Sequence, residues 1–126
     1  MNTTKARLYL GTSGQAFQAS GHSRVFVDWL DQNRNTISRQ RCGQLGFYAR
    51  KLLDLLGAEV AEHVGHDPEA LVARLREADL APVGLANTHR SHLNRAARAL
   101  HAWLNDLDPA ATAAVMDRRP GRPRAA

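Results

Sequence analysis

The sequence is poor in cysteine, aromatic residues and long apolar runs, and each shortage narrows the classes of protein it can encode. Cys42 is the only cysteine, which excludes an internal disulfide and is typical of a reducing compartment. No apolar stretch approaches the roughly 20 residues of a membrane span, and none of signal-peptide length follows Met1. We therefore expect a soluble, cytoplasmic protein with no membrane partner.

The sequence also lacks the residue patterns of common enzyme active sites. It has no glycine-rich phosphate loop, no nucleophile elbow and no pair of carboxylates arranged for acid–base catalysis. The segment Gly11–Gly14 lacks the lysine and the following helix of a phosphate loop. Cys42 has no identifiable base and is better explained as a small buried hydrophobic residue. We therefore expect no enzymatic activity and no cofactor.

Histidine is the one metal-ligand type that recurs at a suggestive spacing. His63 and His66, and likewise His89 and His92, are three residues apart. On a helix this spacing can chelate zinc, and four ligands would close a structural site. No cysteine pair accompanies them, and nothing in the sequence indicates that the two pairs meet. Solvated or capping histidines explain the pattern better, so we expect no metal site.

The charged residues are unevenly distributed along the chain. Four of the 17 basic residues lie after Asp117, so the other 13 nearly balance the 12 acidic residues. Residues 34–51 contain five basic side chains and no acidic one, whereas residues 54–79 contain seven acidic side chains and two arginines. Such segregation gives a protein two electrically different sides and favours a polyanionic partner. Nucleic acid is the leading candidate.

Apolar residues recur at helical spacing, and no convincing pair of strands is present. The chain of 126 residues, 44% of them apolar, fits one domain with a real core. We expect an all-α fold, a compact bundle of four main helices plus a short fifth, with flexible termini. Residues 1–20 are expected to form an arm, 21–117 the helical DNA-binding domain, and 118–126 a disordered basic tail. The expected helices span residues 23–33, 36–56, 67–80, 88–107 and 109–116.

Several helix ends are marked by capping residues. Thr36 is a natural N-cap, and Gly57 offers the left-handed conformation that ends many helices. In Asp67–Glu69, aspartate stands at the N-cap, proline at the first helical position and glutamate where the helix dipole favours it. Asn87 or Thr88 is expected to cap the last main helix.

Two glycines fall inside the expected helix over residues 36–56. Gly43 and Gly46 each cost on the order of 1 kcal/mol relative to alanine in a helix interior. They indicate either a bend in a weak helix or a place where another molecule approaches the backbone closely. The bend is the simpler interpretation.

Four of the large aromatic side chains are expected in the core rather than on a base-stacking surface. Three of them occupy apolar helix rows. The four residues are Phe26, Trp29, Phe47 and Trp103.

Two of the expected helices have basic faces. No carboxylate occurs from Arg90 to Asn105, whereas an ordinary solvated helix face mixes charges of both signs. Arg39 and Arg50 are eleven residues apart, about three turns, and therefore share one face. Side chains of this kind suit phosphate oxygens and base edges. The predicted DNA-binding residues of the two helices are Arg39, Arg41, Arg50, Lys51, Arg90, Asn94, Arg95 and Arg98.

The C-terminal tail resembles the AT-hook, a short segment that lies in the minor groove of A·T-rich DNA. Gly121–Pro123 matches its Gly-Arg-Pro core, but Pro120 stands where that family normally has arginine. This departure removes one of the two arginines that enter the groove, so nonspecific phosphate contact or an inert tail remain alternatives. The tail residues predicted to contact DNA are Arg118, Arg119, Arg122 and Arg124.

From about Ser23 to Leu107, the chain is similar to the SAM-like core-binding N-terminal domain of tyrosine recombinases and phage integrases. The similarity covers about two thirds of the chain and rests on the order and pattern of helices, because that domain has no invariant motif. In that family the second and fourth helices lie against DNA. The segments that carry the resemblance are Phe26–Leu30, Lys51–Leu56, Leu71–Leu75 and Thr88–Leu104.

One departure from the recombinases bears directly on function. Their catalytic domain would begin near Leu107, and Tyr9 and Tyr48 lie too early to serve as its nucleophile. We therefore expect a nonenzymatic protein that binds double-stranded DNA in the cytoplasm, associated with the nucleoid. It would be an accessory factor or a catalytic-domain-less relative of a tyrosine recombinase, with a recombinase or another protein as a further partner. The alternative is a small helical adaptor or inhibitor that binds an acidic protein.

Overall fold

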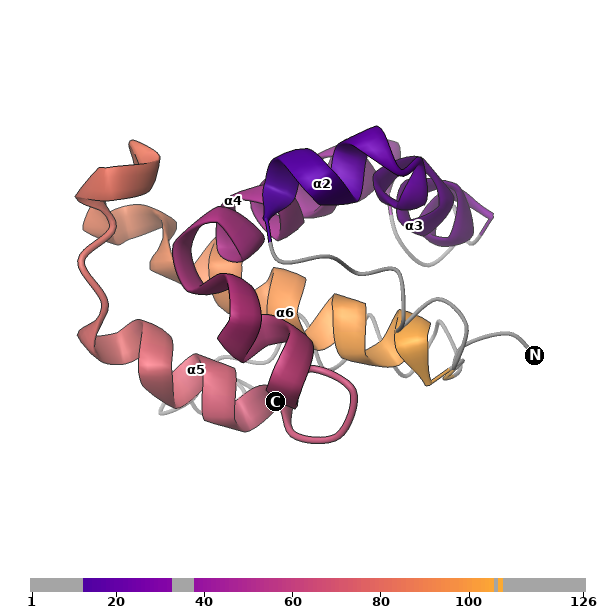
Figure 1. Cartoon of the computed structure of the whole chain (residues 1–126). Coiled ribbons are helices and arrows are strands. Elements are labelled where there is room, and N and C mark those ends of the chain that lie inside the picture. The colour runs from indigo at the N-terminus through magenta and orange to yellow at the C-terminus, as the bar shows by residue number, and fades with distance from the viewer. Residues whose placement is uncertain (1–12, 33–37, 106, 108–126) are drawn as a thin grey trace, which may run out of the picture.

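The computed structural model describes residues 13–32, 38–105 and 107, and within them every regular element is helical (Figure 1). This confirms the all-α bundle that the sequence predicts. The four longer helices correspond to the four predicted main helices. The fifth, short helix of the structure precedes them in the chain. The short helix predicted over residues 109–116 lies outside the described residues. The α-helices are α2 (Gly14–Ala19), α3 (His22–Asp31), α4 (Arg39–His63), α5 (Pro68–Glu77) and α6 (Arg90–Leu104), with 3-10 turns η1 (Ala81–Val83) and η2 (Asn87–His89).

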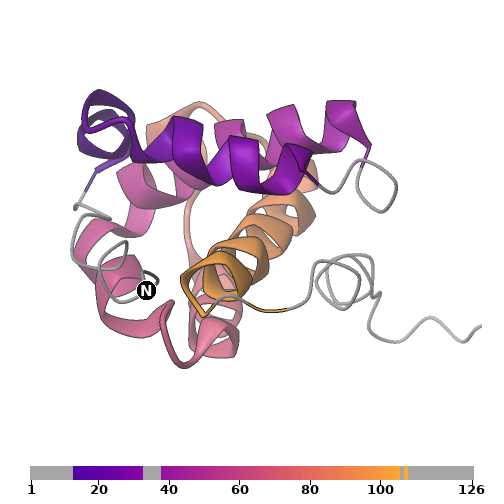
Figure 2. The ribbon, with the colours of Figure 1, turned by 90° about the vertical axis from the view of Figure 1, so that its right-hand side faces the viewer.

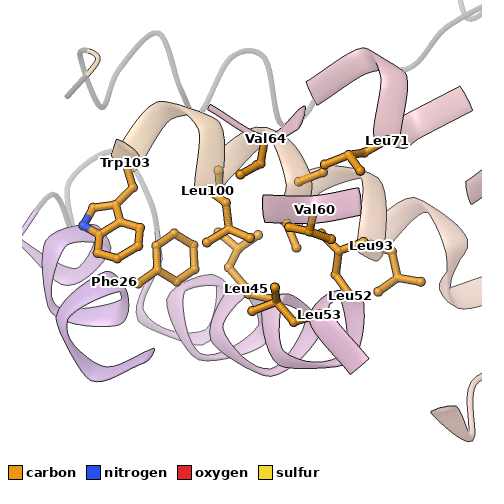
Figure 3. Close-up of a cluster of buried hydrophobic side chains, with 14 of the residues drawn as sticks. Phe26, Leu45, Leu52, Leu53, Val60, Val64, Leu71, Leu93, Leu100 and Trp103 are labelled. Atoms are coloured by element: carbon orange, nitrogen blue, oxygen red, sulfur yellow. The ribbon is translucent and has the colours of Figure 1, made fainter. Parts of the chain in front are cut away.

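Helices α4 and α6 form the centre of the bundle, and α4 packs more extensively on α6 than any other pair of elements packs together. Figures 1 and 2 show α2 and α3 on one side of α6 and α5 on the other. The core between them is aliphatic over most of its length, with Leu45, Leu52 and Leu100 among its fully buried side chains (Figure 3). None of the described helices combines the length and apolar character needed to cross a membrane.

Part of the expected N-terminal arm belongs to the core instead. Residues 1–12 lie outside the described part of the chain, but α2 follows directly and its Phe17 is fully buried. The Phe17 ring lies 6.3 Å from the rings of both Phe26 and Trp103, measured between centroids. The expectation of an arm through residue 20 is therefore wrong for α2, because one phenylalanine in a polar segment is enough to anchor a short helix when an aromatic cluster receives it.

Helix α4 does not end at Gly57, as the sequence predicts, but bends there and continues to His63. Gly57 has φ 35° and ψ −103°, a conformation open to glycine, so its backbone freedom is used for a kink rather than a cap. The helix continues because Val60 and Val64 beyond the bend are completely buried in the core.

The N-terminal signals differ in how well they predict the structure. Asp67 caps α5 through a hydrogen bond from the Ala70 N–H, with Pro68 as the first helical residue, as predicted. Ser38 caps α4 by accepting from the Arg41 N–H, and the expected cap Thr36 lies outside the described residues. Asn87 does not cap α6 but begins η2, so α6 starts at Arg90.

The glycines of α4 have different surroundings. A Cβ at Gly46 would lie 2.5 Å from a methyl carbon of Val27, so this glycine permits the close packing of α3 on α4. A Cβ at Gly43 would meet no atom within 4 Å. Close approach is thus the reason for Gly46, and the neighbour is a helix of the same chain; Gly43 faces open space.

Candidate nucleic-acid interface

Three aromatic rings from α4, η2 and α6 lie together on the surface where these elements meet. The Tyr48 ring is stacked on His92 with centroids 4.8 Å apart and an interplanar angle of 15°, and it lies 6.0 Å from His89. His89 is held in place because its Nδ1 accepts a hydrogen bond from the Ala86 N–H at 3.0 Å.

Cationic side chains of α4 and α6 lie near His92. Arg95 Nη1 lies 3.2 Å from His92 Nδ1, and since a guanidinium can only donate, this contact requires an unprotonated Nδ1. Burial lowers the pKa of His92 below its usual 6.5, and the positive charges of Arg95, His89 and Arg41 lower it further. Among the described residues, the charged groups that act on His92 are cationic, and Arg41 and Arg95 come from the two sides of the α4–α6 contact.

The surface continues along α4 through Phe47. Its ring lies 5.0 Å from the Tyr48 ring at an angle of 85°, and Lys51 Nζ and the Arg50 guanidinium carbon lie 5.5 Å and 6.0 Å from the Phe47 centroid. Phe47 is 40% exposed, so the prediction that it belongs to the core is wrong, whereas Phe26 and Trp103 are buried as predicted. We call the combined set the aromatic–basic surface: Arg41, Phe47, Tyr48, Arg50, Lys51, His89, His92 and Arg95.

A pocket of about 250 Å³ adjoins this surface between α2 and α4. Its lining combines an aromatic ring, two cations, two amides and a carboxylate. Helices α2 and α4 pack closely beside it, since the Gly14 N–H donates to Asp54 Oδ1 at 2.8 Å and a Cβ at Gly14 would lie 2.3 Å from the Arg50 carbonyl oxygen. The lining residues are Gly14, Gln15, Gln18, Phe47, Arg50, Lys51 and Asp54.

Arg90 does not take part in the aromatic–basic surface, because its guanidinium is used inside the fold. Its Nη1 donates to the carbonyl oxygens of Leu75 and Ala78, the latter at 2.9 Å, and its Nη2 donates to Asn87 Oδ1 at 2.7 Å. Arg90 thus donates to two carbonyls at the C-terminal end of α5, of which that of Leu75 also accepts from the Ala78 N–H. The structure therefore places the Arg90 guanidinium in contacts within the fold, apart from the aromatic–basic surface, and the DNA contact of Arg90 stays a prediction.

Arg98 is also engaged within the fold. It forms two hydrogen bonds with the Glu69 carboxylate, at 2.8 and 2.9 Å, and only 11% of its side chain is exposed. The hydrogen bond to Glu69 raises the pKa of Arg98 above its usual value. A carboxylate from the acidic middle of the chain therefore covers a guanidinium that the sequence places in the predicted DNA face.

The polar face predicted for α6 is divided between two directions. His101 Nδ1 donates to the Val64 carbonyl at 2.8 Å, and Asn105 donates to the Gly65 carbonyl at 2.7 Å, so this side of α6 faces the turn between α4 and α5. Asn94 is half-buried, and its Oδ1 lacks a hydrogen-bond partner within the described residues. These contacts do not test the predicted DNA contact of Asn94, which stays a prediction.

The remaining predicted site residues have simpler outcomes. Arg39 is exposed at the first position of α4. Arg118, Arg119, Arg122 and Arg124 lie outside the described residues. Of the predicted set, the structure gathers Arg41, Arg50, Lys51 and Arg95 at the aromatic–basic surface.

The two histidine pairs have separate surroundings. The His63 and His66 rings lie 6.0 Å apart at the end of α4, whereas His92 stacks on Tyr48 and the His89 ring lies 6.0 Å from Tyr48. Within the described ranges, no three or more histidine, cysteine or acidic side chains are grouped so that they could hold a metal ion.

Sequence reasoning missed the contribution of the rings to the site. Phe47 and Tyr48 are followed directly by Arg50 and Lys51, and this interleaving of aromatic and basic residues is the signal that could have indicated them. The stacking of Tyr48 on His92 joins residues 44 positions apart and has no counterpart in a local pattern.

Comparisons with protein-family models, curated proteins and solved structures found no match to this chain.

Proposed function

We propose that this protein is a nonenzymatic DNA-binding protein and that its aromatic–basic surface makes the contact. The supporting observation is that Arg41 from α4 and Arg95 from α6 both act on His92, so cations of two helices converge on one place. Phosphates of a nucleic acid would bring negative charge to the place where Arg41 and Arg95 contribute positive charge.

The distribution of carboxylates supports the same surface. Glu59 and Glu69 pair with Arg74 and Arg98, at 3.0 and 2.8 Å, in the part of the bundle built by α5, the end of α4 and one side of α6. These acidic residues neutralise arginines there. A polyanion would therefore be attracted more strongly to the aromatic–basic surface than to the surface over α5.

The experiment is the salt dependence of duplex binding for the variant R41Q/R95Q. We expect weaker binding and a flatter slope of log K against log salt, by roughly one unit for each lost phosphate contact. The matched control is R74Q, which also removes a guanidinium but from the ion pair with Glu59. Equal affinity and slope in R41Q/R95Q and the unchanged protein would show that DNA does not contact this surface.

The same measurements address the finer parts of the proposal. Comparison with a chain lacking residues 118–126 separates binding by the bundle from binding by the basic, AT-hook-like tail. If the protein is a nucleoid-associated accessory factor of a tyrosine recombinase, we expect the helical bundle without the tail to retain affinity for duplex DNA. Loss of all DNA binding near physiological salt, with an acidic protein still bound, would instead identify the adaptor or inhibitor.

A further inference from the structure

The pocket between α2 and α4 has the size of a site for one small planar group. Its volume of about 250 Å³ is below the roughly 300–1,000 Å³ of sites that hold drug-sized ligands. Gln15, Gln18, Phe47 and Asp54 are all exposed, so the pocket opens at the surface. A single nucleobase matches this size and access.

The chemistry of the lining also suits a nucleobase. Phe47 offers an aromatic wall, and bases of any sequence stack on such rings. The amides of Gln15 and Gln18 and the carboxylate of Asp54 provide donors and acceptors for a base edge. Arg50 and Lys51, within 6.0 and 5.5 Å of the Phe47 centroid, provide positive charge for the flanking phosphates.

The pocket is held open by contacts of its own walls. Asp54 is oriented by the Gly14 N–H, and Arg50 Nη1 donates to Gln18 Oε1 at 2.8 Å, which ties α2 to α4 across the pocket. A site formed before binding pays less to order its side chains. Tyr48, 5.0 Å from Phe47, connects the pocket to Arg41 and Arg95 through the stack on His92.

We propose that this pocket binds one unpaired base of the bound DNA, stacked on Phe47, while the remainder of the aromatic–basic surface holds the adjoining backbone. The inference rests on the proposed function and narrows its substrate class. The preferred ligand is DNA that contains an unpaired base, such as a bulge, rather than a uniform duplex.

The experiment compares three fluorescent DNAs of the same sequence: a perfect duplex, the duplex with one bulged base, and the duplex with an abasic bulge. Anisotropy titration with the full chain should show the bulged base binding at least about fivefold more tightly than the abasic bulge, the lower end for one base–aromatic stack. Because the abasic bulge bends the duplex without offering a ring, this difference isolates stacking from shape.

The variant F47L tests the assigned ring and keeps an apolar side chain at the position. It should bind the bulged and abasic DNAs equally. V25A, which alters another exposed apolar residue, is the matched control and should keep the preference. Thermal unfolding of each variant verifies that it is folded.

The outcomes separate this inference from the proposed function. Equal binding of all three DNAs by the unchanged protein, with duplex binding still weakened by R41Q/R95Q, overturns the base pocket and leaves the DNA-binding function standing. A preference for the bulged base that survives F47L overturns the pocket as its seat. No binding of any DNA overturns both.

Discussion

The guanidinium of Arg98 on α6 and the carboxylate of Glu69 on α5 form a two-pronged contact, with hydrogen bonds of 2.8 and 2.9 Å. They are 29 residues apart in the sequence, and they join the two helices beside the core. The arginine is nearly covered while the glutamate is 61% exposed, so solvent weakens the pair from the acidic side only.

Replacing Glu69 with alanine should lower the free energy of unfolding by about 1 kcal/mol, because the nearly covered guanidinium of Arg98 loses these two hydrogen bonds. Chemical denaturation of E69A, R98A and the double variant gives the coupling energy between the two residues. Duplex affinity of R98A should remain within about twofold. A tenfold loss of affinity in folded R98A would return Arg98 to the DNA surface.

Substitution of Arg90 should destabilise the fold more than substitution of Arg98. R90A should lower the free energy of unfolding by about 2–3 kcal/mol, because a charged donor to two carbonyls at the end of α5 disappears. R90K should recover only part of this loss, since one ammonium group cannot reproduce the guanidinium fork. If R90A were as stable as the unchanged protein by urea denaturation, the assigned hydrogen bonds would contribute nothing.

Two glycine-to-alanine changes should have opposite effects. G14A should lower the free energy of unfolding by about 2 kcal/mol or more, because its Cβ would overlap the Arg50 carbonyl oxygen. G43A should raise it by about 0.5–1 kcal/mol, since alanine is the better helix former and the added methyl meets no atom. Paired urea curves measure both.

The same G43A variant bears on the proposed partner. Should a nucleic acid approach the α4 backbone at Gly43, G43A would bind DNA more weakly although it is more stable. Unchanged affinity would assign the glycine no role in binding.

His92 should make stability depend on pH. Its folded-state pKa is lowered by burial and by Arg95, His89 and Arg41, so the unfolded chain binds a proton more readily. The contribution of neutral His92 to folding stability is fully present above the ordinary histidine pKa of 6.5. It is lost as the pH falls towards the lower pKa of His92 in the folded protein. Urea denaturation at pH 7.5 and 5 should therefore show a smaller loss of stability in H92Q than in the unchanged protein.

A matched change at His66, which is exposed in the turn before α5, controls for loss of a histidine as such. H66Q should retain the loss of stability between the two pH values. An identical pH dependence in H92Q and the unchanged protein would contradict the assignment to His92.

The parts of the fold that depend on neighbouring residues in the sequence were predictable. The cap at Asp67 needs only the next three residues, and the apolar row of α6 places Leu93, Leu100 and Trp103 in the core as expected. Helix α2 was not predictable in this way, because its stability comes from the distant aromatic cluster around Phe17. Tertiary packing overrides weak local preference there.

The positive charge of the candidate site was predictable from the sequence, but the set of residues that form the site was not. The basic segment of α4 indicated Arg41 and Lys51, which the structure places near His92 and the Phe47 ring, respectively. The sequence could not show that Glu69 reaches Arg98, because a helical wheel displays one face and not its neighbours.

The bend at Gly57 has an electrostatic consequence. The first part of α4 carries Arg39, Arg41 and Lys51, and the part after the bend carries Glu59 and Glu62. In a straight helix, the basic and the acidic residues would lie along one line beneath a long anionic strand. The bend at Gly57 instead changes the direction of the helix axis, so the basic residues before it and the two glutamates after it do not follow one straight line.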